Sequence, residues 1–237
     1  VLTENFIDFE VFSQEDLKAP TGKVAVLDFK GHLKNFLKNN NIKNVDFNSN
    51  TPQDVPVLVS THKAENDDEL KLFKRLLKFV ESGGTAVYLD RLTDSVKIEN
   101  TITPFTTRVH PSKGLWTCIP HVAKEHPILE GLQNNGFLRN SYENIWPKKS
   151  LRDLRVNGVR VKEKPLVASI AFDWFSRGHK MGYSGPGPSW WGADMTFVSF
   201  KKGQYLLSQF ELLENLGKDP VADRILFNII RFFNAKD

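Results

Sequence analysis

The feature that most restricts the fold is an alternation of apolar runs and amphipathic stretches over residues 23–90. Residues 23–29 (KVAVLDF) and the later run VPVLVSTH have the composition of buried strands, and the amphipathic HLKNFLKNN lies between them. Apolar residues then recur at helical spacing over residues 65–82, and Gly83-Gly84 separates them from the apolar TAVYLD. Strands that alternate with helices are typical of a parallel sheet. The chain is therefore expected to be an α/β protein.

The rest of the chain is expected to complete a single domain over residues 1–237. Residues 1–20 form an N-terminal arm, and residues from about 91 to 164 form a long irregular insertion with many Pro, Asn and Trp residues. Regular patterning returns in PLVASIAF, MTFVSF and QYLLSQF, with Lys201-Lys202-Gly203 as a hairpin turn. The final helix begins at Asp219-Pro220, because Asp is a good N-cap and Pro suits the first helical position.

The composition excludes several classes of protein. The 32 Lys and Arg residues exceed the 28 Asp and Glu residues by four, and we interpret them as spread along the chain, so no nucleic-acid partner is predicted. Every apolar run is far shorter than the roughly 18 residues of a membrane span, so no membrane partner is predicted. A single cysteine, Cys118, excludes an internal disulfide. The first residue, Val1, fits a processed protein or a piece of a longer one.

Four stretches of the chain carry a resemblance to a known family. They are LFKRLLKFVESGGTAVYLD, HPILEGL, KKGQYLLSQFEL and DPVADRILFNIIRFF. Their order resembles the class I glutamine amidotransferase-like fold, which includes the ThuA-like proteins. The last two stretches are most similar to the domain appended to bacterial family 2 glycoside hydrolases of the β-galactosidase type. The resemblance implies a flavodoxin-like three-layer sandwich with a mostly parallel central sheet.

The chemistry implied by this resemblance is tested at two positions. An active amidotransferase carries a nucleophilic Cys in a Gly-flanked turn after the strand that here reads TAVYLD, where this chain has Asp90-Arg91-Leu92. The family's general base follows a Gln-Phe pair in a late strand, and here Glu211 follows Gln209-Phe210. Asp90 and Glu211 thus occupy degenerate triad positions, and we predict no catalytic residue.

A loop with unusual composition, residues 172–195, is the best candidate binding surface. Its aromatic rings are suited to stacking on sugars, and its polar side chains are suited to bonding their hydroxyls. The alternative is that the tryptophans plug the end of the sheet or pack on a neighbouring domain. The carbohydrate-binding candidates are Trp174, Tyr183, Trp190, Trp191, Asp173, Arg177, His179 and Asp194.

Other reactive side chains are weaker candidates. Cys118 has His121 three residues later, but its apolar neighbours favour an inert buried thiol. His110, His121 and His126 share the irregular region, yet a lone histidine is more often a hydrogen-bonded structural residue than a ligand. We therefore predict no metal site and no cofactor.

We expect a non-catalytic accessory domain of a carbohydrate-degrading enzyme, in contact with a carbohydrate, neighbouring domains or further copies of itself. Such a parent enzyme implies a periplasmic or extracellular location. One alternative is a free-standing ThuA-like sugar-processing enzyme that uses some of Asp90, Glu211, His121 and His179 as acid-base groups. A second alternative is a stand-alone carbohydrate-binding module.

Overall fold

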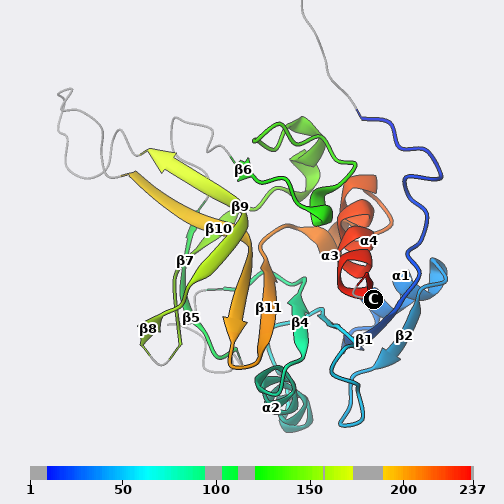
Figure 1. The fold of residues 1–237 in the computed structure, drawn as a ribbon, viewed down its shortest axis with the longest axis vertical. Helices are drawn as coiled ribbons and strands as arrows, with labels where there is room; N and C mark the ends of the chain where they lie inside the picture. The colour runs from blue at the N-terminus through cyan, green and yellow to red at the C-terminus, as the bar shows by residue number, and fades with distance from the viewer. Residues whose placement is uncertain (1–9, 94–102, 112–120, 157, 173–188, 236–237) are drawn as a thin grey trace, which may run out of the picture.

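A computed structural model describes residues 10–93, 103–111, 121–156, 158–172 and 189–235. All eleven strands found in these residues belong to one sheet, whose main path runs β2-β1-β3-β4-β11-β10-β7-β5. Figure 1 shows this sheet with helices around one half and antiparallel strands forming the other. The predicted α/β class is confirmed, with a sheet that is partly antiparallel.

The parallel half of the sheet contains five strands. They are β1 (Lys23–Leu27), β2 (Lys43–Asp46), β3 (Val57–Val59), β4 (Thr85–Tyr88) and β11 (Gly203–Ser208). Neighbouring strands in the order β2-β1-β3-β4-β11 pair in parallel. With β11 as the fifth strand, this is the 2-1-3-4-5 order of flavodoxin-like sheets. Such sheets change winding direction between the first and third strands, which is where their ligands bind.

Helices cover both faces of this half. The core side chains of α1 (His32–Asn39) and α4 (Pro220–Asn234) pack with one face of β1, and those of α2 (Asp67–Glu81) pack with the other. A short helix, α3 (Leu212–Asn215), precedes α4. The predicted start of the last helix is confirmed, because Asp219 Oδ1 accepts from the N–H of Val221 at 2.8 Å and Pro220 takes the first turn.

The antiparallel half contains β5 (Thr106–Pro111), β6 (His121–Ala123), β7 (Lys149–Val156), β8 (Val159–Arg160), β9 (Glu163–Phe172) and β10 (Ser189–Phe200). Two 3₁₀ turns, η2 (Pro127–Leu129) and η3 (Asn140–Ile145), lie between β6 and β7. Four of these strands, β5 to β8, fall in the segment that we expected to be irregular. They escaped the pattern because β6 and β8 are very short and β7 has a bulge at Asp153, where φ is 51°.

The predicted turn at Lys201-Lys202 is confirmed, because Phe200 pairs with Gly203 across it. Gly203 is required in this turn because there is no room for a side chain. A Cβ atom at this position would lie 2.3 Å from the carbonyl oxygens of Gly84 and Val80. The turn that opens β11 therefore lies directly on the backbone that links α2 to β4.

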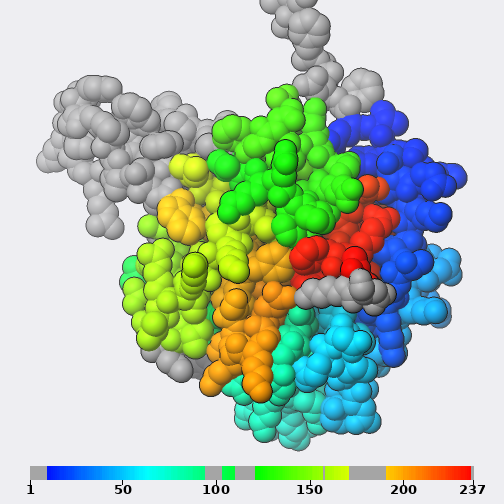
Figure 2. Space-filling view, in the orientation of Figure 1, coloured from blue at the N-terminus to red at the C-terminus, as the bar shows by residue number. Residues whose placement is uncertain are grey.

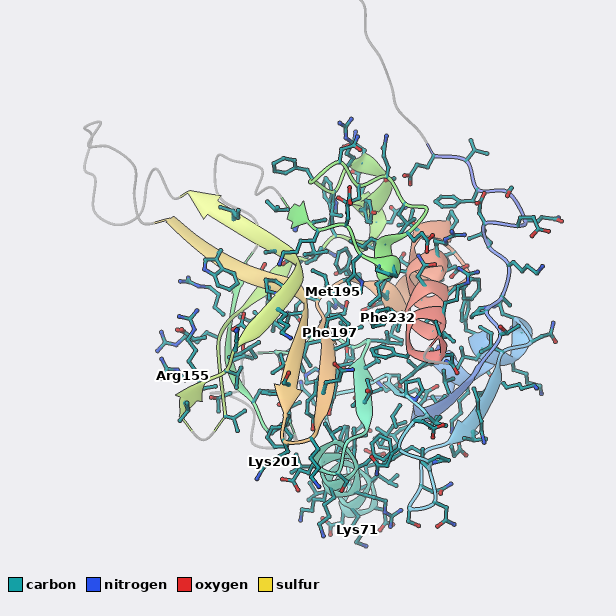
Figure 3. The ribbon with its side chains drawn as sticks, in the orientation of Figure 1. Lys71, Arg155, Met195, Phe197, Lys201 and Phe232 are labelled. Atoms are coloured by element: carbon teal, nitrogen blue, oxygen red, sulfur yellow. The ribbon has the colours of Figure 1, made fainter. Side chains whose placement is uncertain are left out.

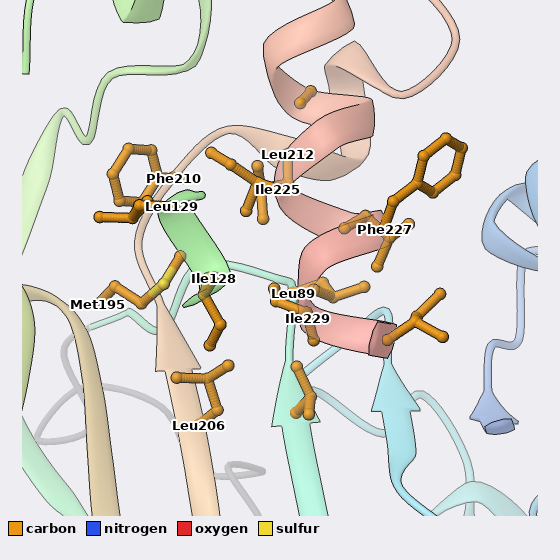
Figure 4. Packing of buried hydrophobic residues seen from close by; sticks show 14 of the residues in the cluster. Leu89, Ile128, Leu129, Met195, Leu206, Phe210, Leu212, Ile225, Phe227 and Ile229 are labelled. Atoms are coloured by element: carbon orange, nitrogen blue, oxygen red, sulfur yellow. The ribbon is translucent and has the colours of Figure 1, made fainter. Parts of the chain in front are cut away.

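A wedge of apolar residues joins the two halves. Ile128 and Leu129 of η2 are buried in the same core as Met195 of β10, Leu206 of β11 and Ile229 of α4. Figure 4 shows the two η2 side chains lying between these strands and the helix. The long excursion after β5 thus returns to the core and fills the space beside α4.

The described part of the N-terminal arm, residues 10–22, is bound to the body of the protein. Arg224 of α4 donates to the carbonyl oxygen of Asp16, and Arg231 donates to that of Lys18 at 2.5 Å. In Figure 2 the blue arm accordingly lies beside red α4. Within the described residues, none of the helices has the length and apolarity needed to span a membrane.

Candidate functional site

The candidate site is a cavity of about 520 Å³ at the carboxyl ends of the parallel strands. Asp28 and Lys30 follow β1, Ser60 and Thr61 follow β3, and Asp90 follows β4. This is the point between β1 and β3 where a sheet of this order opens a crevice. The cavity is also lined by other charged side chains, namely Lys63, Glu65, Glu69, Glu214 and Lys218. Charges of both signs make it suited to a polar ligand.

Asp28 is a structural residue at the floor of this cavity. Its side chain accepts from the N–H of Gly31 at 3.1 Å, from the N–H of Lys34 at 3.0 Å and from the hydroxyl of Ser60 at 2.8 Å. Gly31 has a φ of 76°, a left-handed conformation that brings the first turn of α1 over the carboxylate. Asp28 therefore fixes the entry into α1, and Ser60 is tied to it.

Asp90 forms a partly buried pair with His62. Asp90 Oδ2 lies 2.5 Å from His62 Nδ1 and also accepts from the backbone N–H of His62 at 3.2 Å. The other ring nitrogen, Nε2, lies 3.1 Å from the hydroxyl of Thr93. Since both ring nitrogens have partners and the residue is 5% exposed, His62 serves to join the ends of β3 and β4.

Glu211 is held in a network of ion pairs at the end of β11. Arg91 donates to Glu211 and, at 2.5 Å, to Glu214, and Lys148 donates to Glu211 at 2.9 Å. Gln209, two residues before Glu211, accepts from the N–H of Leu92 at 2.7 Å. These bonds fasten the chain after β4 to the chain after β11. Asp90 and Glu211 therefore lie at the same edge of the sheet, each engaged by different partners.

The aromatic loop is described only in part. Trp174, Tyr183, Asp173, Arg177 and His179 lie outside the described residues. The backbone of Trp190 pairs with Ala171, although its side chain is not described, and Trp191 is 44% exposed on β10. Trp191 is thus the member of the predicted set whose ring is seen at the surface.

Asp194 does not belong to a surface site, contrary to our expectation. It is fully buried, and its carboxylate accepts from Ser150 Oγ at 2.5 Å and from Ser169 Oγ at 2.7 Å. His121 Nδ1 lies 2.9 Å from its Oδ2. The prediction assigned Asp194 to an irregular loop, whereas it belongs to strand β10, in which residues 192–196 are all buried.

These residues do not form a hydrolytic triad. Ser169 Oγ and Asp194 Oδ2 both contact the same ring nitrogen of His121, at 3.1 and 2.9 Å. A Ser-His-Asp relay needs the serine and the carboxylate on opposite nitrogens of the ring. The cluster is therefore an internal polar network between β6, β7, β9 and β10. His121 is not brought to the cavity that contains Asp90.

The remaining histidine and cysteine candidates take structural roles or fall outside the described residues. His126 Nδ1 accepts from the N–H of Ile128 at 3.2 Å and so caps η2. Burial lowers the pKa of His126 below its usual value. Cys118 and the side chain of His110 lie outside the described residues. In the part of the chain that is described, no three His, Cys, Asp or Glu side chains are placed to hold a metal.

Sequence reasoning did not single out Asp28, which lines the cavity, or His62 and Arg91, which connect the loops beside it. Their signal was positional, because each follows a parallel strand within three residues, where an open α/β sheet holds its site.

Comparisons with known proteins give only distant structural neighbours. No family model matches the chain, and no curated protein is significantly similar to it. A ThuA-like protein from Bacteroides uniformis is 13% identical with a TM-score of 0.45, and the match covers 93% of this chain and 94% of that protein. A cytoplasmic protein from Salmonella typhimurium LT2 is 12% identical with a TM-score of 0.45, over 90% of this chain and 99% of that one. A β-galactosidase from Rahnella sp. R3 is 12% identical with a TM-score of 0.44, and 90% of this chain spans 31% of it. At these values we derive neither activity nor site residues from the neighbours.

Proposed function

We propose that this chain is a non-catalytic accessory domain of a carbohydrate-degrading enzyme. One observation carries the proposal. The two positions where the resembled amidotransferases hold a nucleophile and a base carry Asp90 and Glu211, and both carboxylates are engaged in internal contacts. An acid-base group needs a free lone pair or proton directed at its substrate. Oδ2 of Asp90 and both carboxylate oxygens of Glu211 instead make contacts that connect the loops at the end of the sheet.

The surface supports contact with other domains or with sugar. Large apolar side chains are exposed away from the cavity, including Val11 at 80%, Val159 at 70%, Phe137 at 52% and Trp191 at 44%. An exposed tryptophan on a strand offers a flat face of the kind that stacks on sugar rings. Trp191 would make such a contact together with the rest of the aromatic loop.

The proposal is tested by the activity of the isolated chain. The 237-residue protein is incubated with nitrophenyl glycosides and with glutamine, and product release is followed for many hours. We expect no turnover above buffer. Turnover that disappears in Asp90→Asn or Glu211→Gln, and persists in the exposed control Asp54→Asn, would show a catalytic protein and refute the proposal.

The genomic context provides an independent test. A reading frame that joins this chain to a sugar-cleaving domain supports the accessory role. In such a protein, Trp191→Ala is expected to weaken binding of the polysaccharide substrate while leaving cleavage of a small glycoside unchanged. A reading frame that encodes this chain alone contradicts the proposal.

A further inference from the structure

Four arginines meet on the antiparallel half of the sheet. Arg108 of β5 is paired directly with Arg152 of β7, and Arg155 of β7 is paired directly with Arg160 of β8. Side chains at paired positions of antiparallel strands lie on the same face, about 5 Å apart at their Cβ atoms. Each pair therefore sets two positive charges next to each other.

The bulge in β7 places both pairs on one face. Leu151 and Leu154 are fully buried in the core, so their neighbours Arg152 and Arg155 point away from it. Without the bulge at Asp153, residues three apart in a strand would point to opposite faces. Figure 3 labels Arg155 beside β8, at the rim of the molecule. We call Arg108, Arg152, Arg155 and Arg160 the arginine face.

Three members of the arginine face have no ion-pair partner among the described residues. Arg108, Arg155 and Arg160 are exposed, and within the described residues none of the three is in an ion pair. Two acids lie near, Asp153 in the bulge and Glu163, whose pKa burial raises while Arg160 opposes the rise. Like charges directly opposed across a ladder destabilise a sheet. An anionic group bound between the guanidinium groups would offset this repulsion.

The charge excess of the chain is concentrated here, which corrects the even spread that we inferred from the sequence. Residues 148–164 contain seven Lys and Arg residues and two Asp and Glu residues, a net +5 against +4 for the whole chain. The strands of this segment form the lime-green rim in Figure 2. The net charge of the remaining residues is therefore close to zero.

We infer that the arginine face binds an acidic polysaccharide through its carboxylate or sulfate groups. A guanidinium offers a planar fork of donors that matches these oxyanions, and two adjacent forks hold one anionic group between them. Two arginine pairs on one face suit a chain with repeated charges rather than a single ion. The choice of a glycan among polyanions rests on the proposed function, whereas the anion site rests on the arginines themselves.

The competing explanation is protection of strand edges. β5 and β8 each pair with β7 alone among the described strands, and charged side chains on edge strands prevent aggregation. This explanation predicts that removing the arginines reduces solubility and leaves glycan binding unchanged.

The test is affinity electrophoresis and calorimetry of the full chain with polygalacturonate, which carries carboxylates, and with chondroitin sulfate, which carries sulfates as well. Neutral galactan and single-stranded poly(dT) are the comparison ligands. The variant Arg108→Gln/Arg160→Gln removes one arginine from each pair. The matched control, Lys74→Gln/Arg75→Gln, removes the same charge from exposed positions on α2.

We expect binding to at least one acidic glycan at low salt, weakened about tenfold or more in the arginine variant, since charge-assisted hydrogen bonds are lost from both pairs. The control should stay within about twofold, and the melting temperature of the arginine variant should be unchanged or higher, because opposed like charges are removed. Equal weakening in both variants, or no acidic-glycan binding at all, overturns the inference. Preference for poly(dT) over both glycans also overturns it. If the chain binds acidic glycans through the arginine face but also turns over a sugar, the accessory role is refuted and the anion site stands.

Discussion

Replacing Asp194 by alanine tests whether the buried polar network holds the strands of the antiparallel half together. The carboxylate is fully buried and accepts from Ser150, Ser169 and His121, which come from three different strands. Its removal leaves these three groups without their shared acceptor in the interior. Breaking a buried charged network by deleting one partner costs about 3 to 5 kcal/mol.

The expected change is large enough to measure without ambiguity. For a protein of this size, each kcal/mol lowers the melting temperature by about 2 to 4 °C, so Asp194→Ala should melt roughly 6 to 20 °C below the parent. Urea unfolding gives the free energy of unfolding directly. Asp194→Asn, which keeps one acceptor oxygen, should have a stability between those of the parent and of Asp194→Ala. The exposed control Asp54→Ala should change stability by less than about 0.5 kcal/mol.

The reasoning fails if Asp194→Ala loses less than about 1 kcal/mol, or if it resembles Asp54→Ala. Either result would mean that the network contributes as little as a surface pair.

Three further perturbations test the cap, the turn and the ion-pair network. Burial lowers the pKa of His126, so the unfolded chain binds more protons and stability should fall as the pH drops below about 6.5; His126→Asn, which keeps the cap, should flatten this slope in urea titrations. Gly203→Ala forces a Cβ atom against two carbonyl oxygens and should cost about 1 to 3 kcal/mol in urea unfolding, whereas a silent substitution would mean that the turn can move. Arg91→Ala leaves the mostly buried Glu211 with Lys148 alone and should lower the free energy of unfolding by about 1 to 2 kcal/mol. Because salt screens ion pairs, high salt should also lower the stability of the parent protein. A parent protein whose stability does not change with salt would contradict that reading.

The elements with strong local signals were predictable. The buried strands β1, β4 and β11 and the helices α2 and α4 each have a long periodic pattern with a cap or a glycine at the end. Strands β5 to β8 were not predicted, since short or bulged strands do not alternate regularly. Asp194 shows a related limit, because the Gly-, Pro- and Trp-rich composition predicted a loop where the chain forms the buried strand β10.

The sequence by itself determined the α/β class, the parallel half and the absence of a cysteine from the corner after β4, because these depend on residue type and local periodicity. Only the tertiary structure decided what the charged residues do. Asp90 is joined to His62, Glu211 to Arg91, and Arg108 to Arg152 by strand order and register, across 28, 120 and 44 residues of sequence. Electrostatic interactions depend on distance in space, so charges that are scattered along the chain become ion pairs or a face of like charges only when the sheet sets their neighbours.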